Sequence, residues 1–335
     1  MFDAGGRWSF QGPTGAERYL IVYQNNADPN AVGSGVVNAD GVVAEVNRLK
    51  QEGSTSRWGI LDFEAPFDEI LINGTSDPRY SAAVASLIGT IRRVKSEFPD
   101  MKWTYFGFPN LPYHPTGKDW GVIPDDQKNL IFDSFNGGYG PVLDELDFIM
   151  PCVYDVYESA LNMPQSYSQP DVAESTARVS KIESIKRHFS IRGLPVPPII
   201  PAASPWFQTG GGTGAAHPWK AIPIIEFMRD QVAPCLDAGA SGFALWGAMP
   251  YFNAVATTPP QPNWPAYLVA EQAAIREGLM EALGVPSGSV VSWTDSTTRA
   301  TLEGAGDLVM TEAIRQIQIA AAARQPNTVA NSTTP

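Results

Sequence analysis

The sequence predicts an α/β fold of the (β/α) TIM-type barrel kind, with fewer than eight regular strands and a C-terminal helical extension. Short apolar runs alternate with longer amphipathic segments, which is typical of βα units around a parallel sheet. No glycine-rich turn follows the first apolar run, so a dinucleotide-binding fold lacks its fingerprint. Most runs end in residues suited to a sugar site, and (β/α) barrels build their sites from the carboxyl ends of strands.

Strands and helices are expected in alternation along the chain. The strands are short runs rich in β-branched and aromatic residues, at 18–24, 58–63, 102–108, 146–154, 197–202 and 241–247. The helices are expected where apolar residues recur with helical spacing, near 40–52, 80–97, 125–136, 171–190, 221–237 and 264–283. Six units are fewer than the eight of a standard barrel, so some strands are weak or missing.

The composition changes after residue 284, which predicts a barrel domain over 1–284 and an extension over 285–335. The extension begins with a Gly, Ser and Thr-rich segment, continues with a helix near 308–323, and ends in a flexible tail. This helix either caps the barrel or docks on a protein partner or a second copy of the chain, and capping is the simpler interpretation. Its apolar stripe consists of Met310, Ile314, Ile317 and Ala321.

Composition and charge exclude several classes of function. The 335 residues are 44% hydrophobic and 17% charged, enough for a large core. The formal net charge of -12 argues against nucleic acid, anionic membranes and polyanionic substrates as partners. No run reaches the length of a membrane span, so no membrane insertion is expected. No signal peptide is visible. The localisation is left open, and an extracellular or a virion-associated protein is compatible with the sequence.

No metal or other cofactor is expected. Cys152 and Cys235 are interpreted as buried thiols, with a bridge only if the fold brings them together. Neither CxxC nor HExxH occurs, and the histidines His114, His188 and His217 are widely spaced.

The most informative stretch is WGILDFEAPFDEI at 58–70, where an apolar strand ends in Asp62 and Glu64. Residues two apart on a strand share a face, so these carboxylates lie side by side with Cα atoms about 6.5–7 Å apart. Repulsion and burial raise the pKa of one member of such a pair, which keeps it protonated as a general acid. Glycoside hydrolysis needs this acid. The alternative is a polar collar where a strand meets its loop.

Four motifs together resemble the hyaluronidase family. ILDFEAP is similar to that family's DWE signature, and WTYFGFPNLPYH (103–114) to its aromatic strand followed by GFPDCYN. MPCVY (150–154) is similar to the PSVY strand, and FALWG (243–247) to the LWG that closes the site. The motifs occur in the family's order over roughly 18–284.

The resemblance implies a retaining mechanism in which the substrate's own 2-acetamido oxygen attacks the anomeric carbon. Glu64 would be the acid/base and Asp62 the carboxylate that orients the acetamido group. Tyr154 would hydrogen-bond the acetamido region, and Trp246 would form the floor under the sugar. A pair too close for an inverting water fits this chemistry, since the nucleophile belongs to the substrate. Enclosure by Tyr154, Trp246 and Phe106 would orient the acetamido group.

Departures from the family bear on the substrate more than on the fold. Phe106 stands where the family has a tyrosine, and Tyr105 lies on the opposite face of the strand. The missing hydroxyl would have to come from Tyr113 or Tyr23. Where the family's acidic-strand motif continues with EWRP, this chain has APFDE and so lacks the arginine. Leu111 stands where the family usually has a cysteine. Because the chain is acidic, a neutral N-acetylhexosamine glycan is a better substrate than hyaluronan.

Further residues complete the predicted substrate site. Trp206 lies in a glycine-rich segment, 203–220, that we expect to face substrate, although tryptophans in α/β proteins are more often core. The predicted substrate-binding set is Tyr23, Tyr105, Phe106, Asn110, Tyr113, Tyr154, Trp206 and Trp246.

Three functions remain open on the sequence. The leading one is a retaining glycoside hydrolase that acts on a polysaccharide or oligosaccharide containing N-acetylhexosamine. The second is an inactive carbohydrate-binding or structural protein on the same barrel, such as a surface or virion component. The third is a lysozyme-like or chitinase-like hydrolase on a related barrel.

Overall fold

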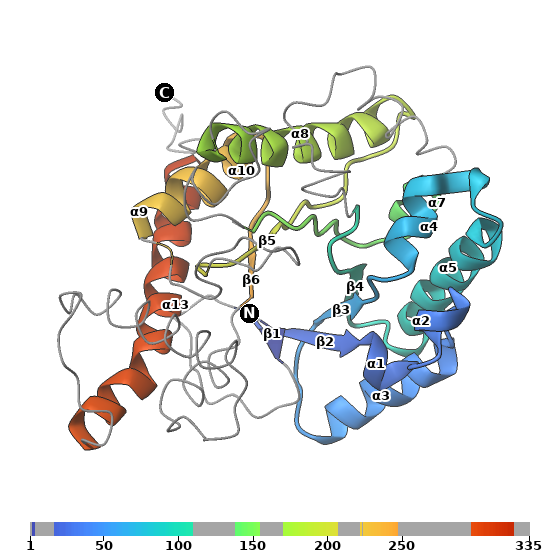
Figure 1. The fold of residues 1–335 in the computed structure, drawn as a ribbon, viewed down its shortest axis with the longest axis horizontal. Helices are drawn as coiled ribbons and strands as arrows, with labels where there is room; N and C mark the ends of the chain where they lie inside the picture. Colours follow the sequence, from blue (N-terminus) through green and yellow to red (C-terminus); the bar gives the residue numbers. More distant parts are fainter. Residues whose placement is uncertain are drawn as a thin grey trace, which may run out of the picture.

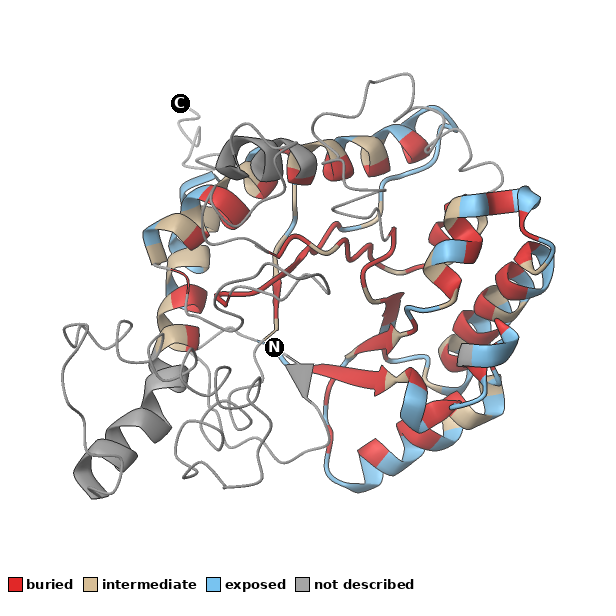
Figure 2. Ribbon diagram, viewed as in Figure 1, coloured by how far each residue is buried: buried red, intermediate tan, exposed pale blue. Residues whose placement is uncertain are grey.

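The structure is a computed structural model that describes residues 2–3, 17–109, 138–154, 170–206, 222, 224–246 and 296–324. In Figure 1 the strands lie at the centre and the helices form an arc around them. Figure 2 shows that the strands and the inner faces of the helices are buried, whereas the outer faces of the helices are exposed. The predicted helices near 125–136 and 264–283 lie outside the described residues.

The first half of the chain forms a parallel sheet in the order β1-β2-β3-β4. Its strands are β1 (Phe2–Asp3), β2 (Tyr19–Tyr23), β3 (Trp58–Asp62) and β4 (Lys102–Tyr105). In the register, Tyr23 pairs with Asp62 and Leu61 pairs with Tyr105. The carboxyl ends of β2, β3 and β4 therefore meet at one edge of the sheet.

The parallel order continues through the second half by single bridges and short ladders. Gly107 is bridged to Pro151 and Cys152 to Ala202, and β5 (Ala202–Ala203) pairs with β6 (Ala244–Leu245). The sequence predicted longer strands at 146–154, 197–202 and 241–247. Prolines explain the interruption of the first two, because Pro151, Pro198 and Pro201 have no N–H to donate to a ladder. Within the described residues, no strand pairing joins β6 to β1, so the barrel is not closed there.

Two amphipathic helices cover the first sheet as predicted. They are α3 (Ala39–Gln51) and α5 (Tyr80–Glu97), which pack on each other. Asn38 begins α3 by accepting the backbone N–H groups of Asp40 and Gly41. The helix α4 (Phe67–Asn73) follows the carboxylate loop. Four further short helices were not predicted from the sequence: α1 (Gln24–Ala27), α2 (Ala31–Ser34), η1 (Gly74–Ser76) and α7 (Gly140–Leu143).

The helices of the second half differ more from the prediction. The helix α8 (Pro170–Ser190) matches its expected range. The segment expected as one helix at 221–237 is α9 (Ile224–Phe227), the π-helical η6 (Met228–Val232) and α10 (Ala233–Asp237). Pro234 accounts for the irregularity, because it cannot donate to the carbonyl of Asp230 one turn earlier.

The C-terminal helix α13 (Ser296–Arg324) begins well before the expected residue 308. Good helix formers such as Arg299, Leu302 and Glu303 outweigh the local Gly, Ser and Thr content. Met310 and Ile314 of the predicted stripe are buried in the main core of their own chain, as capping requires. No helix in the described part of the chain is long and apolar enough to cross a membrane.

The core has two layers. One lies between the strands and the surrounding helices and contains Leu61, Trp103 and Tyr105. Gly59 is needed in this layer, because a Cβ there would come within 2.2 Å of the Trp103 ring. The other layer fills the inward faces of the strands, where Tyr19, Ile21, Ile60, Phe148, Met150, Tyr154, Ile200, Ala202 and Ala244 meet.

Candidate active site

The inward faces of the first three long strands place polar and aromatic side chains at one end. Tyr23 ends β2 and lies opposite Asp62, the last residue of β3. Phe106 follows β4, where its backbone N–H donates to the carbonyl of Leu61 at 2.9 Å. Because side chains alternate along strands, Tyr23, Asp62 and Phe106 share the inward face.

Aromatic rings from the second half complete this end of the inner layer. The ring centroid of Tyr154 lies 6.2 Å from that of Phe106 and 6.4 Å from that of Trp246. Trp246, directly after β6, packs against the same inner layer as Tyr23. Four aromatic residues from separate parts of the chain thus lie beside Asp62.

Asp62 is the most perturbed carboxyl group of the site. Its Oδ1 is buried and has no hydrogen-bond partner among the described residues. Burial, followed by the negative charges of Glu64 and Asp68, raises the pKa of Asp62 to about 7. A buried acceptor without a donor is costly, so this oxygen is suited to an N–H group of a ligand.

Glu64 lies at the mouth of the site, on the turn between β3 and α4. Its side chain is exposed, yet the surrounding protein still raises its pKa by burial. Burial raises the pKa of Cys152, and the charge of Glu64 adds to this effect. The predicted pair therefore consists of a half-buried Asp62, whose Oδ1 is buried, and an exposed Glu64.

The loop that carries Glu64 is held by Gln24, a residue that the sequence patterns did not indicate. Gln24, directly after β2, donates from Nε2 to the carbonyl of Ala65 at 3.0 Å. Asp68 and Glu69 occupy the first turn of α4, where the helix dipole favours acidic residues. A polar residue directly after a predicted strand was the available signal for Gln24.

Two buried cations of α8 hold the strand end that carries Tyr154. Arg178 donates to the carbonyls of Val153 at 3.0 Å and Asp230 at 2.7 Å. Lys181 donates to the carbonyl of Cys152 at 3.0 Å. The Asp230 carbonyl is the one to which Pro234, one turn later, cannot donate. Cations spaced along an amphipathic helix usually face solvent, so the sequence did not reveal this role.

The other predicted site residues lie elsewhere. Tyr105 is fully buried on the helix side of β4, where its hydroxyl donates to the Leu87 carbonyl at 2.8 Å. Trp206 is fully buried in the main core. Both therefore lack the access that stacking on a sugar requires, and we leave them out of the proposed site. Asn110 and Tyr113 lie outside the described residues.

Metal ligation finds no support in the described segments, which contain no group of three or more His, Cys, Asp or Glu residues able to hold an ion. No disulfide joins Cys152 and Cys235.

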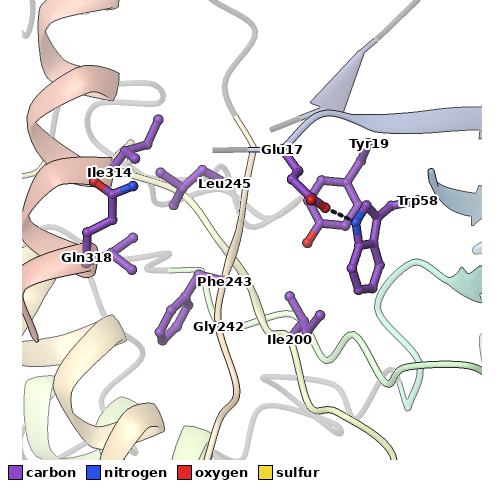
Figure 3. A pocket seen from close by; sticks show the side chains of 10 residues that line it. Glu17, Tyr19, Trp58, Ile200, Gly242, Phe243, Leu245, Ile314 and Gln318 are labelled. Atoms are coloured by element: carbon purple, nitrogen blue, oxygen red, sulfur yellow. Dashed lines mark hydrogen bonds between the residues drawn. The ribbon is translucent and has the colours of Figure 1, made fainter. Parts of the chain in front are cut away.

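A cavity of about 280 Å³ lies at the opposite, N-terminal end of the strands (Figure 3). Tyr19, Trp58 and Ile200 line one side, and Phe243 and Ile314 line another. None of the predicted site residues borders this cavity. It is therefore separate from the carboxylate pair.

Comparisons with known proteins give a relationship of fold. The sequence matches no model of a known protein family and no curated protein. A crystal structure of bee venom hyaluronidase is similar with a TM-score of 0.52 and 12% identity, over 86% of this chain and 88% of that chain. The fold is TIM-barrel-like. A second structure of bee venom hyaluronidase, in complex with a hyaluronic acid tetramer, has a TM-score of 0.49 and 13% identity, over 69% of this chain and 79% of that chain.

Proposed function

We propose that this protein is a glycoside hydrolase that cleaves a glycan containing N-acetylhexosamine with retention of configuration. The observation that carries the proposal is the Asp62 carboxyl group, whose buried Oδ1 has no hydrogen-bond partner in the described part of the chain and whose neighbour Glu64 is exposed. The fold neighbour's name, hyaluronidase, agrees with the four motifs.

The aromatic residues favour a sugar as the ligand. Tyr23, Phe106, Tyr154 and Trp246 are partly or largely buried and surround the Asp62 end of the inner layer. Aromatic rings offer apolar faces to the C–H groups of a pyranose, while hydroxyl and indole N–H groups bind its polar edges. This combination suits one sugar ring enclosed beside the carboxylates.

The 2-acetamido group of the substrate fits the unpartnered acceptor. Its N–H would donate to Oδ1 of Asp62, which directs the acetamido oxygen to the anomeric carbon. That oxygen attacks as the glycosidic bond breaks, and the product is a cyclic oxazolinium ion. No enzyme nucleophile is required.

Glu64 then has two tasks. As a carboxylic acid it donates its proton to the leaving glycosidic oxygen. As a carboxylate it removes a proton from the water that attacks the anomeric carbon and reopens the ring, which restores the acid and retains the configuration.

The proton shared by the pair connects the two roles. Without substrate, the pKa of about 7 keeps the proton on Asp62 below neutral pH. An N–H donated to Asp62 stabilises its ionised form, so the proton is more favourable on Glu64, where catalysis needs it. Substrate binding would therefore prepare the acid.

The test is a reducing-end assay on chitin oligomers, peptidoglycan, hyaluronan and chondroitin. Glu64→Gln should lower turnover by about 10²–10⁴-fold, the usual contribution of general acid–base catalysis. Glu69→Gln, which changes an exposed carboxylate of the adjacent helix, is the matched control and should retain activity. Full activity in Glu64→Gln would refute the assignment.

A carbohydrate-binding protein without turnover is the second candidate. Phe106 favours it, because this inward-facing ring has no hydroxyl where the family has a tyrosine. Glycan binding that survives Glu64→Gln, without new reducing ends from any substrate, would support this candidate.

A further inference from the structure

The cavity at the N-terminal end of the strands lies between the two ends of the strand array and α13 (Figure 3). Tyr19 of β2 and Trp58 of β3 line one side, and Phe243 and Leu245 of the β6 segment line another. In the described part of the chain, no strand pairing joins β6 to β1 or β2. The cavity therefore occupies the opening between these strands, and α13 covers it.

Two aromatic rings and a carboxylate form one wall of the cavity. Tyr19 and Trp58 pair in the register of β2 and β3, and their ring centroids are 5.9 Å apart at an interplanar angle of 47°. Glu17 lies two residues before Tyr19, and its carboxylate accepts a hydrogen bond from the Trp58 Nε1–H (Figure 3). This hydrogen bond holds a negative charge beside the two rings. In agreement, burial and then the charge of Glu17 raise the pKa of Tyr19.

The rest of the wall is mostly aliphatic. Ile200, Leu245 and Ile314 border the cavity and are otherwise buried in the core. Among the described residues that line the cavity none is basic, and Glu17 is the one carboxylate. A volume of about 280 Å³ is at the lower end of the range for ligand pockets, so the space suits one small molecule.

These features together select one class of ligand. The charge of Glu17 repels anions. A sugar ring would bury several hydroxyl groups against aliphatic side chains that offer no hydrogen bonds, which is costly. A molecule with an apolar body and a positively charged head avoids both problems. Its head is attracted by aromatic faces and forms charge-assisted hydrogen bonds with a carboxylate, while its body is removed from water.

We propose that this cavity binds a small organic ammonium ion, with its charged head against Glu17, Tyr19 and Trp58 and its apolar body toward Ile200 and α13. This site is additional to the proposed glycan site, because none of the predicted site residues borders the cavity. The ligand would also contact α13 and the strands at once, so its binding should raise the thermal stability of the chain.

The test compares benzylammonium, benzyl alcohol and benzoate by calorimetric titration of the whole chain at neutral pH. The three probes share a ring and differ in the charge of the head group. Benzylammonium should bind about tenfold more tightly than benzyl alcohol, and benzoate should bind most weakly. Equal affinities for benzylammonium and benzyl alcohol, or no binding of either, would overturn the inference.

Variants of the wall test the roles of the carboxylate and the indole. Glu17→Gln should abolish the preference for benzylammonium, because the amide carries no charge. Trp58→Phe keeps a ring but not the indole, and should reduce the preference in part. Glu183→Gln changes a carboxylate of α8 that is 53% exposed, and is the matched control that should bind as the wild type does. A preference that survives Glu17→Gln would contradict the assignment.

A further pair of variants locates the bound ion. The candidate active site is also acidic, so Glu64→Gln is titrated with the same probes and should keep the preference. A preference lost in Glu64→Gln but kept in Glu17→Gln would place the ion at the candidate active site and refute the cavity. Ile317→Trp fills the cavity from α13 and should prevent the binding of both benzyl compounds, with thermal unfolding as the check that the variant is folded. Glycan cleavage is measured separately, so failure of the proposed function leaves this result intact.

Discussion

Replacing Asp62 by asparagine should stabilise the protein at alkaline pH. The folded chain holds the proton of Asp62 up to a pKa of about 7, whereas the unfolded chain releases it near 3.8. Between these values the folded state binds more protons than the unfolded state, so the free energy of unfolding falls as the pH rises. Asparagine removes this titration and keeps the shape of the side chain.

The magnitude follows from the shift. Between pH 5.5 and the Asp62 midpoint near pH 7, over about 1.5 pH units, the folded state keeps a proton that the unfolded state has released. At 1.36 kcal/mol per unit, the wild type should lose about 2 kcal/mol relative to Asp62→Asn between pH 5.5 and pH 8. Above pH 7 both states are ionised, and the difference becomes constant.

Urea unfolding of both proteins at pH 5.5, 7 and 8 measures this difference. Asp100→Asn, which changes an exposed aspartate of a surface turn, is the control and should follow the wild type. Because the raised pKa of Glu64 acts in both proteins, the comparison isolates Asp62. Parallel pH dependences for wild type and Asp62→Asn would refute a buried, protonated Asp62.

Three further changes test the packing. Gly59→Ala should destabilise by about 1–3 kcal/mol, because its Cβ meets the Trp103 ring at 2.2 Å, and thermal unfolding measures this. Gly89→Ala, in the middle of α5 with nothing within 4 Å of the new Cβ, should instead stabilise by about 0.5–1 kcal/mol. Met310→Ala should lose about 2–5 kcal/mol in urea unfolding, because Met310 is 3% exposed, whereas Ile319→Ala, at 51% exposure, should lose little. Equal effects of the last two would contradict the docking of α13 on the core.

Local periodicity was sufficient for the long helices and the regular strands. The range predicted for α5 agrees with the structure, as do β2 and β3 to within a residue or two, because each has a continuous apolar pattern and no internal proline. The strands at 146–154 and 197–202 were predicted too long, since an apolar pattern does not reveal the ladder bonds that prolines remove.

The candidate site was predictable only in part. The spacing of Asp62 and Glu64 places them on one face of any strand, and the motifs added Tyr154 and Trp246. The sequence could not show that Trp206 is buried away from substrate, because its burial depends on packing against residues distant in sequence. The same reason applies to Arg178 and Lys181, whose partners are carbonyls of another segment.

The sequence by itself determined the alternation of strands and helices and the side-by-side placement of two carboxylates. These are properties of neighbouring residues, and backbone geometry decides them locally. Only the tertiary structure decided that Asp62 is the more buried member, that Glu64 is the more accessible one, and that Tyr154 lies beside Trp246. Burial and contacts between distant strands arise when the sheets curve around a shared inner layer, and that layer raises the pKa of Asp62 to about 7.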